Sequence, residues 1–421
     1  MKLNHLLSKT QLLKQENNTL VFNNQQAKEL LEQYGSPLYI YLEDVFRKCC
    51  QDMKNLVTYP HFKVSYAVKA NNNINLLKIA REEGLSVDAI SPGEIFLEQT
   101  AGFDTSEIFF VSNNVDVSEF RFAMERGIQI SVDSLSQLDL FGRNFPGSKI
   151  AVRINPGIGD GHHAKVITAG DKTKFGIHAT ELQEIKNIAA KYNLSINGVN
   201  MHVGSNFLTI DNFITASKVL LSNAEMFIDT LEFVDIGGGI GISYKDGQEV
   251  DLKLLGQTLD ELFYAFSKKH NKMVTFCIEP GRYVCAQSAI LLATVHSIKT
   301  TPFTTFVGTD AGFNVLMRPM TYDSYHEILN CNNVRGEQTP VSICGNICET
   351  GDLLAKDREL TATKEGDVLA VLDAGAYGYS MASNYNARLR PAEVLLKNDG
   401  RTKLIRRRDT LADILANQIV E

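Results

Sequence analysis

The stretch "HFKVSYAVKAN" at residues 61–71 alternates apolar residues with small or polar ones, which is typical of a β-strand with two different faces. Its apolar face consists of Phe62, Val64, Tyr66 and Val68. Its other face consists of Lys63, Ser65, Ala67 and Lys69. The alternation recurs in "NGVNMHVGS" at 197–205 and in "MVTFCIEPG" at 273–281. A strand that helices cover on both sides is apolar on both faces, so this pattern favours a barrel whose inner face converges on an axis.

Strand-like runs alternate with longer amphipathic stretches from about residue 36 to residue 283, which is the pattern of repeated βα units. The expected strands include residues 38–42, 63–70, 128–133, 149–157, 198–205, 231–239 and 273–281. The expected helices include residues 75–83, 134–141, 181–192, 211–229 and 252–270. We therefore predict an α/β fold in which residues 36–283 form a (β/α)8 TIM-type barrel. Residues 1–35 plus 284–421 are expected to form a second, antiparallel β-rich domain, because the later segments are rich in strand formers punctuated by Gly and Asp.

The composition excludes several function classes. The chain of 421 residues carries a formal net charge of −7, so it lacks the basic field that nucleic acid or an anionic membrane would require. Its seven cysteines have neither Cys-x-x-Cys spacing nor the spacing of zinc ligands, so we expect reduced thiols and no metal. The N-terminal residues lack a signal-peptide core, and no apolar run has the length of a membrane span. We expect a cytoplasmic protein that acts on small polar molecules.

Chemically different groups fall at the carboxyl ends of the expected barrel strands, where TIM barrels place their chemistry. They are Lys69, His202, the glycines Gly237, Gly238 and Gly239, and Glu279. Taken singly, each has an ordinary structural explanation, such as a solvated lysine, a core histidine, a tight turn or a structural Glu–Arg pair. Together they supply an amine nucleophile, a ring for stacking, backbone N–H groups for a phosphate and a carboxylate for a heteroaromatic nitrogen. Pyridoxal phosphate requires these groups, and we predict it as the cofactor.

The motifs at these strand ends are "YAVKAN" at 66–71, "HVGS" at 202–205, "IGGG" at 236–239 and "EPGR" at 279–282. In them, and along most of its length, the chain resembles the fold-type III, alanine-racemase-like pyridoxal phosphate enzymes, and among these the diaminopimelate decarboxylases. The resemblance implies that Lys69 attaches the cofactor, that His202 stacks on its ring and that Glu279 pairs with the ring nitrogen. It also implies contacts to the cofactor or nearby substrate from Ser205, Gly237, Gly238, Gly239, Pro280, Gly281, Arg282 and Tyr377.

Segments beyond the expected barrel also match the family. "LMRPMTYDSYHEI" at 316–328 resembles its R-P-x-x-Y segment, which implies that Arg318 and Tyr322 bind the substrate carboxylate. "ICETGDLLAKD" at 347–357 resembles its C-E-x-x-D segment, which implies a proton donor at Cys348 and a partner for the distal ammonium group at Glu349. The signature at 373–395 contains Tyr377, and with Arg282 this tyrosine is expected near the substrate as well.

The resemblance implies the decarboxylation of meso-2,6-diaminopimelate to L-lysine and carbon dioxide, the last step of lysine biosynthesis. It also implies a homodimer with shared active sites, to which the second domain contributes substrate and dimer contacts. One alternative is a related decarboxylase of ornithine, arginine, carboxynorspermidine or a conjugate. An amino-acid racemase and a non-catalytic cofactor-binding homologue are further alternatives, although a non-catalytic homologue is expected to have lost Lys69 or Cys348.

Three positions depart from the usual family pattern. Pro92 replaces a glycine, Asn206 replaces a glutamine, and residues 110–116 differ from the common threonine-glycine-asparagine form. These changes remove no catalytic group, but they are expected to reshape loops around the cofactor and to affect the fine specificity for the substrate.

Overall fold

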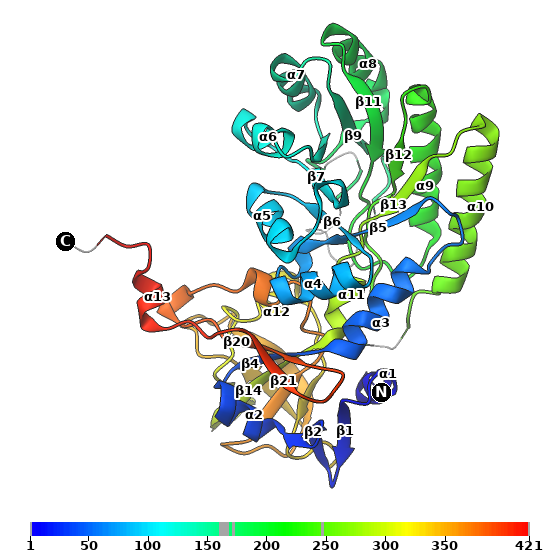
Figure 1. Ribbon diagram of the computed structural model, residues 1–421. Coiled ribbons are helices and arrows are strands. Elements are labelled where there is room, and N and C mark those ends of the chain that lie inside the picture. The colour runs from blue at the N-terminus through cyan, green and yellow to red at the C-terminus, as the bar shows by residue number, and fades with distance from the viewer. Residues whose placement is uncertain (1, 160–167, 171–172, 246–247, 420–421) are drawn as a thin grey trace. The chain divides into compact units, whose positions relative to one another are not determined.

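The computed structural model describes residues 2–159, 168–170, 173–245 and 248–419 (Figure 1). The chain divides into two compact units. The barrel unit comprises Cys49–Ile242 and Gln248–Val284. The sheet unit comprises Met1–Lys48, Ser243–Gly247 and Cys285–Glu421. Each unit has its own β-sheet and its own buried core.

Eight parallel strands form a closed ring in the barrel unit. In ring order they are β5 (Phe62–Ala67), β6 (Ser86–Ala89), β7 (Ile108–Val111), β8 (Gln129–Val132), β9 (Lys149–Asn155), β11 (Ser195–Asn200), β12 (Phe233–Asp235) and β13 (Thr275–Ile278). The ring closes because β13 pairs with β5 and β8 pairs with β9. A two-residue strand, β10 (Ile177–His178), pairs with the end of β9. The prediction of a TIM-type barrel is confirmed.

Helices lie outside the ring of strands (Figure 1). They are α4 (Ile74–Glu82), α5 (Pro92–Ala101), α6 (Val117–Met124), α7 (Leu135–Asn144), α8 (Leu182–Lys191), α9 (Asp211–Ala224) and α10 (Leu252–His270). Several begin at a side-chain cap; Asp251, for example, accepts a hydrogen bond from the backbone N–H of Leu254. Helix α10 ends where Asn271 adopts φ +47°, and its bounds are those predicted from the sequence. None of the described helices combines the length and hydropathy needed to cross a membrane.

The strand Leu38–Leu42, expected in the barrel, was wrongly placed. It is β4, which pairs in antiparallel orientation with β14 (Ala289–Thr300) and in parallel orientation with β20 (Ala392–Leu396). All five of its residues are buried. The run "LYIYL" lacks the small or polar face that the inner surface of the barrel requires, and this explains its place in the middle of another sheet.

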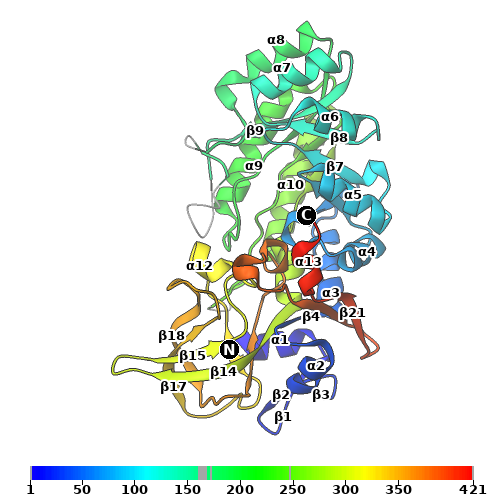
Figure 2. The same ribbon diagram turned by 90° about the vertical axis from the view of Figure 1, so that its left-hand side faces the viewer.

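The sheet unit is mixed rather than purely antiparallel. Its further strands are β15 (Thr305–Thr309), β16 (Ile328–Asn330), β17 (Gln338–Cys344), β18 (Leu353–Thr361), β19 (Val368–Val371) and β21 (Thr402–Arg406). Most neighbours are antiparallel, but β15 pairs with β17 in parallel orientation, as β20 does with β4. Figure 2 shows β14, β15, β17 and β18 side by side.

The N-terminal segment of the sheet unit forms a small sheet of its own. It consists of β1 (Leu13–Glu16), β2 (Thr19–Phe22) and β3 (Gln25–Gln26), between α1 (Lys2–Lys9) and α2 (Ala27–Tyr34). The remaining helices are α3 (Glu43–Lys54), α11 (Arg282–Cys285), α12 (Arg318–Tyr322) and α13 (Leu411–Leu415).

Candidate active site

Lys69 lies two residues beyond the end of β5, in a short 3-10 turn of Val68–Ala70. Its Nζ is 3.3 Å from Oδ2 of Asp88 on the neighbouring strand β6. Burial raises the pKa of Asp88, and the Lys69 ammonium opposes that rise through its charge and hydrogen bond. The strand end thus holds an amine in a fixed position beside a buried carboxyl group.

His202 follows β11 by two residues, and its ring is held on one side. Its Nδ1 accepts a hydrogen bond from the backbone N–H of Gly204 (3.1 Å) and lies 3.0 Å from Oγ1 of Thr168. Burial lowers the pKa of this imidazole well below its usual value, and the charges of Lys69 and Arg153 lower it further. A neutral ring at this rim offers a flat face rather than a charge.

The three glycines after β12 pack too closely against neighbouring backbone for any side chain. A Cβ at Gly237 would overlap the carbonyl oxygen of Met201, and one at Gly238 would overlap that of Glu279. Gly237 has φ +77° and Gly239 has φ +105°, where other residues are strained. These positions form a cradle of bare backbone.

A buried cation lies next to this cradle. Arg282 donates hydrogen bonds to Oγ of Ser205 from Nη2 (3.0 Å) and Nε (3.3 Å), and only 4% of the arginine is exposed. Gly281, the residue before Arg282, packs closely against β5: a Cβ on Gly281 would lie 3.1 Å from Cβ of Ala67. The backbone carbonyl of Pro280 accepts a hydrogen bond from the N–H of Ala67. A guanidinium and a hydroxyl are typical ligands of an anion.

Glu279 directly follows β13 and is buried. Its Oε1 has no hydrogen-bond partner among the described residues. Burial raises the pKa of this carboxyl well above its usual value, the charges of Asp235 and Asp88 raise it further, and Lys69 and Arg153 oppose the rise. A buried carboxyl oxygen without a donor is costly unless a ligand supplies one.

The chemistry and placement of these groups fit pyridoxal phosphate. The cradle admits an anion close to backbone N–H groups, and Arg282 adds a positive charge. The unsatisfied Oε1 of Glu279 can accept a hydrogen bond from a protonated ring nitrogen. Lys69 provides an amine on the same rim, since β5, β12 and β13 are parallel strands of one barrel.

The sheet unit holds the other predicted residues, beginning with Arg318 and Tyr322 on α12. Arg318 is almost fully buried at 1% exposure. Its Nη1 is 2.7 Å from Nε2 of His326, its Nη2 donates to Oγ of Ser324 (3.3 Å), and its Cζ lies 4.5 Å from the ring centre of Tyr244. Because Nδ1 of His326 lies 2.9 Å from the Leu372 carbonyl and donates to it, Nε2 is left as an acceptor for the arginine.

Cys348 and Glu349 lie together in an exposed turn before β18. The backbone N–H of Cys348 donates to Oδ1 of Asn386 (2.9 Å), and Oε1 of Glu349 accepts from the Tyr385 hydroxyl (2.7 Å). Tyr377 has φ +56°, which is rare for a bulky residue and is often found at functional sites.

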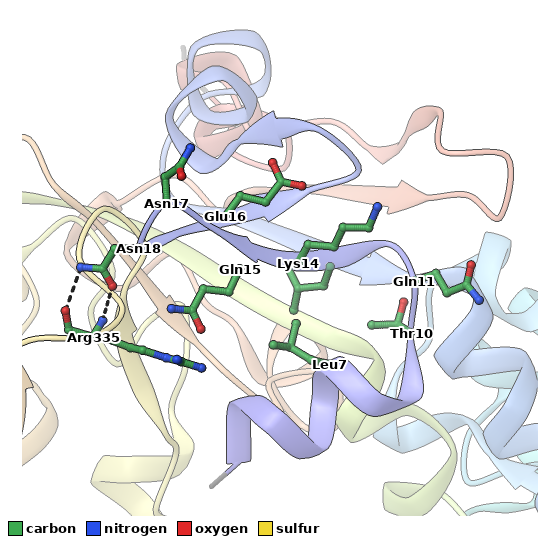
Figure 3. A pocket seen from close by; sticks show the side chains of 10 residues that line it. Leu7, Thr10, Gln11, Lys14, Gln15, Glu16, Asn17, Asn18 and Arg335 are labelled. Atoms are coloured by element: carbon green, nitrogen blue, oxygen red, sulfur yellow. Dashed lines mark hydrogen bonds between the residues drawn. The ribbon is translucent and has the colours of Figure 1, made fainter.

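The sheet unit also contains a groove of about 750 Å³, and none of these residues lines it (Figure 3). Its lining comprises Leu7, Thr10, Gln11, Leu13, Lys14, Gln15, Glu16, Asn17, Asn18 and Arg335. Asn18 is joined to the backbone of Arg335 by two hydrogen bonds of 2.6 and 2.8 Å. This lining contains no histidine or cysteine and no residue predicted for the site.

The three departures from the family pattern have local explanations. Pro92 is the first residue of α5, where a missing N–H costs nothing, and Ser91 caps the helix. Asn206 adopts φ +69°, which asparagine tolerates well, and its Oδ1 accepts a hydrogen bond from the N–H of Ile242. Within residues 110–116, Asn114 also has a positive φ, and Asp116 caps α6.

Sequence reasoning missed Asp88, Asp235 and Arg153. Asp235 ends the strand "FVD", Asp88 stands inside "SVDA", and Arg153 stands inside "AVRIN". All three are buried, and each influences the pKa of Glu279. A charged residue within an otherwise apolar barrel strand was the available signal.

Comparison with known proteins assigns the family. Residues 42–286 match the pyridoxal-binding domain of the pyridoxal-dependent decarboxylases, and residues 263–375 match their C-terminal sheet domain. The chain is 39% identical to diaminopimelate decarboxylase of Methanothermobacter thermautotrophicus, over 95% of this chain and 96% of that protein. For the enzyme of Methanocaldococcus jannaschii the identity is 36%, over 94% and 93%. A crystal structure of the Helicobacter pylori enzyme complexed with L-lysine superposes with a TM-score of 0.85 at 30% identity, covering 92% of this chain and 98% of that one. The chain therefore belongs to the diaminopimelate decarboxylase family of pyridoxal-dependent decarboxylases.

Proposed function

We propose that this chain decarboxylates meso-2,6-diaminopimelate to L-lysine and carbon dioxide with pyridoxal phosphate as its cofactor. The observation that carries the proposal is 39% identity over 95% of the chain to an enzyme of that name, in a protein whose barrel brings an amine, an imidazole, a glycine cradle and a buried carboxyl to one rim. When bound, the cofactor supplies an electron sink for the carbanion left after carbon dioxide departs.

In this proposal Lys69 attaches the cofactor, and Asp88 orients its amine through their 3.3 Å ion pair. The cradle Gly237–Gly239, together with Ser205 and Arg282, holds the phosphate. The close packing of Gly281 against Ala67 supports this phosphate site, because that packing fixes the distance between Arg282 and the end of β5, where Lys69 lies. Anchoring the phosphate orients the cofactor's reacting end and leaves Lys69 and the other reacting groups available for the reaction.

His202 and Glu279 act on the cofactor ring. A neutral imidazole stacks without placing a second positive charge beside a protonated ring, and the lowered pKa of His202 supports this role. Glu279 keeps a proton on the ring nitrogen, and the unsatisfied Oε1 supports this role.

Recognition of the substrate requires both signs of charge, because its distal end is itself an amino acid. Arg318 supplies the cation for the distal carboxylate with Tyr322 beside it on α12, and Glu349 supplies the anion for the distal ammonium group. The neutral acceptor Nε2 of His326 fixes the guanidinium without neutralising it. Tyr377 contributes to cofactor and substrate contacts, which its rare backbone conformation supports.

Cys348 returns the proton at the carbon that lost its carboxylate. We infer a homodimer in which Cys348 and Glu349 of one subunit complete the site of the other. Their exposure in the single chain supports this arrangement. We also infer a reducing, cytoplasmic setting, which the odd number of cysteines without Cys-x-x-Cys spacing supports.

Purified, cofactor-loaded protein is expected to form lysine and carbon dioxide from meso-diaminopimelate. The kcat/KM for this substrate should exceed those for ornithine and arginine by about 10- to 100-fold, which is the value of a charge-assisted hydrogen bond to the distal carboxylate. Chromatographic quantification of lysine, putrescine and agmatine measures the ratio. Putrescine formed as fast as lysine would contradict the proposed substrate.

The Arg318→Met variant provides the matched control for that ratio. It removes the cation but keeps an unbranched side chain in the buried site, so the preference for diaminopimelate over ornithine should shrink through a higher KM. A folded variant with unchanged preference would exclude Arg318 from recognition of the distal carboxylate.

Mixing two inactive variants tests the shared site. Lys69→Ala and Cys348→Ala homodimers, once their subunits exchange, should regain activity from roughly a quarter of all sites, because each hybrid dimer contains one complete site. Replacing the Cys348→Ala partner with the Lys69→Ala/Cys348→Ala double variant is the control and should give no recovery. Hybrid dimers that form, as shown by two affinity tags, but remain inactive would exclude sharing.

A further inference from the structure

A second cavity lies inside the barrel unit, at the amino-terminal ends of the strands. It has a volume of about 310 Å³. Its lining comprises Lys63, Ser65, Ser106, Ile108, Phe109, Gln129, Asn197, Glu232, Phe233, Asp235, Thr275 and Cys277. The rim reaches solvent, since the Glu232 side chain is 49% exposed. A cavity of this size and polarity has room for several water molecules, each of which occupies about 30 Å³.

The inward-facing residues of the barrel strands form successive layers along the barrel axis, and the lining of the cavity belongs to the layers at the amino-terminal end. On β12 and β13 the cavity is lined by the first and third residues, which are Phe233 and Asp235 on one strand and Thr275 and Cys277 on the other. Asp235 pairs in register with Cys277, and Glu279 follows Cys277 by two residues. Because side chains alternate between faces, Glu279 is the next inward residue on its strand toward the cofactor rim. Asp235 therefore stands one layer below Glu279, at the inner end of the cavity.

Asp235 is a fully buried carboxyl with spare hydrogen-bonding capacity. Its Oδ1 accepts from the backbone N–H of Gly237 (2.8 Å), whereas its Oδ2 has no partner among the described residues. Asp235 and Glu279 interact across the neighbouring strands β12 and β13, and an interaction of hydrogen-bond type with Glu279 lowers the pKa of Asp235 against the effect of burial. Two carboxyl groups can share a hydrogen bond only when one of them carries a proton.

The surrounding charges favour one shared proton. Burial raises the pKa of both carboxyls, and the charge of Asp235 raises that of Glu279 further. Among the other ionisable groups that face the pair, Asp88 on β6 also raises both pKa values. Lys63 on β5 opposes the rise at Asp235, whereas Lys69 and Arg153 oppose it at Glu279. The pKa of the neighbouring Cys277 thiol is itself raised. The pair resembles two carboxyls that cannot both ionise at close range.

We propose that Asp235 is a proton-relay residue that connects Glu279 to water in the amino-terminal cavity. A water-borne proton binds Oδ2 of Asp235, and the carboxyl then passes a proton to Glu279 and returns to a carboxylate. Glu279 is thereby loaded from the end of the barrel opposite Lys69, without passage through the substrate site. This inference rests on the proposed contact of Glu279 with the ring nitrogen but not on the identity of the substrate.

The first test uses the cofactor-free protein with 13C-labelled glutamate carboxyl groups. Asp235→Asn keeps an oxygen for the Gly237 N–H but removes the charge, so the pKa of Glu279 measured by NMR should fall. Asp260→Asn is the matched control, because Asp260 accepts hydrogen bonds from Thr58 and Tyr59 outside the strands. It should affect stability and leave the pKa of Glu279 unchanged. An unchanged Glu279 pKa in Asp235→Asn would overturn the shared proton.

The second test follows the proton itself in protein loaded with 15N-labelled pyridoxal phosphate. Exchange of the ring-nitrogen proton with deuterium should slow at least about tenfold in Asp235→Asn. Thr275→Leu, which fills the cavity without altering a carboxyl, should slow it too and remains informative if Asp235→Asn does not fold. Wild-type exchange rates in the folded variants would overturn the route. The readout does not depend on turnover of diaminopimelate, so failure of the proposed substrate is recognised separately.

Discussion

Replacing Lys69 with alanine is expected to abolish covalent attachment of pyridoxal phosphate and to reduce kcat for decarboxylation by at least about a thousandfold. The reason is positional, because the Lys69 amine is held 3.3 Å from Asp88 at the rim where the glycine cradle and Glu279 also lie. Borohydride treatment followed by peptide mass spectrometry should find the cofactor on Lys69 of the wild type and nowhere on the variant.

The matched control is Lys78→Ala on the exposed side of α4. Alanine suits a helix, so this variant should fold, bind the cofactor and turn over as the wild type does. If the Lys69→Ala protein retained a borohydride-stable adduct at another lysine together with full activity, Lys69 would not be the attachment site.

Glu279→Gln is expected to lower kcat by about 10²- to 10³-fold while leaving the protein able to bind pyridoxal phosphate. An amide in place of the carboxyl cannot hold a ring nitrogen in its protonated form, so the ring becomes a weaker electron sink. The phosphate cradle and Lys69 are untouched by the substitution. Steady-state kinetics measure the loss of kcat, and the 15N shift of the labelled ring nitrogen measures the loss of its proton. Glu261→Gln on the surface of α10 is the control.

The same variant should change the pH dependence of stability in the cofactor-free protein. The folded state raises the pKa of Glu279, so it retains a proton that the unfolded chain releases. The contribution of Glu279 to the free energy of unfolding is therefore lost as pH rises from the ordinary glutamate pKa through the raised one. Glu279→Gln should gain stability relative to the wild type across that window. A difference in the free energy of unfolding between the two proteins that stays the same at all pH values would contradict a raised pKa of Glu279.

The sequence sufficed where the information is local. Helix α10 was predicted with its observed bounds, because the amphipathic pattern that defines it lies within one short segment. The alternating faces of β5 likewise identified the barrel, since a strand lining a narrow axis carries small or polar residues on its inner side.

The sequence did not suffice where strand partners matter. Leu38–Leu42 reads as a strand in any fold, and its hydrogen-bond partners β14 and β20 are more than 240 residues away. No local pattern states which edge a fully apolar strand will pair with, so its assignment to the barrel was wrong.

By itself, the sequence placed Lys69, His202 and Glu279 at strand ends and predicted a common cofactor for them, because residue type and position along a strand are local properties. Only the tertiary structure placed Asp88 beside Lys69 and Asp235 one layer below Glu279. These pairings depend on the register between neighbouring strands, and the proton affinities that follow depend on burial inside the closed barrel. Residue types can be read from the chain, whereas distances and desolvation exist only once it has folded.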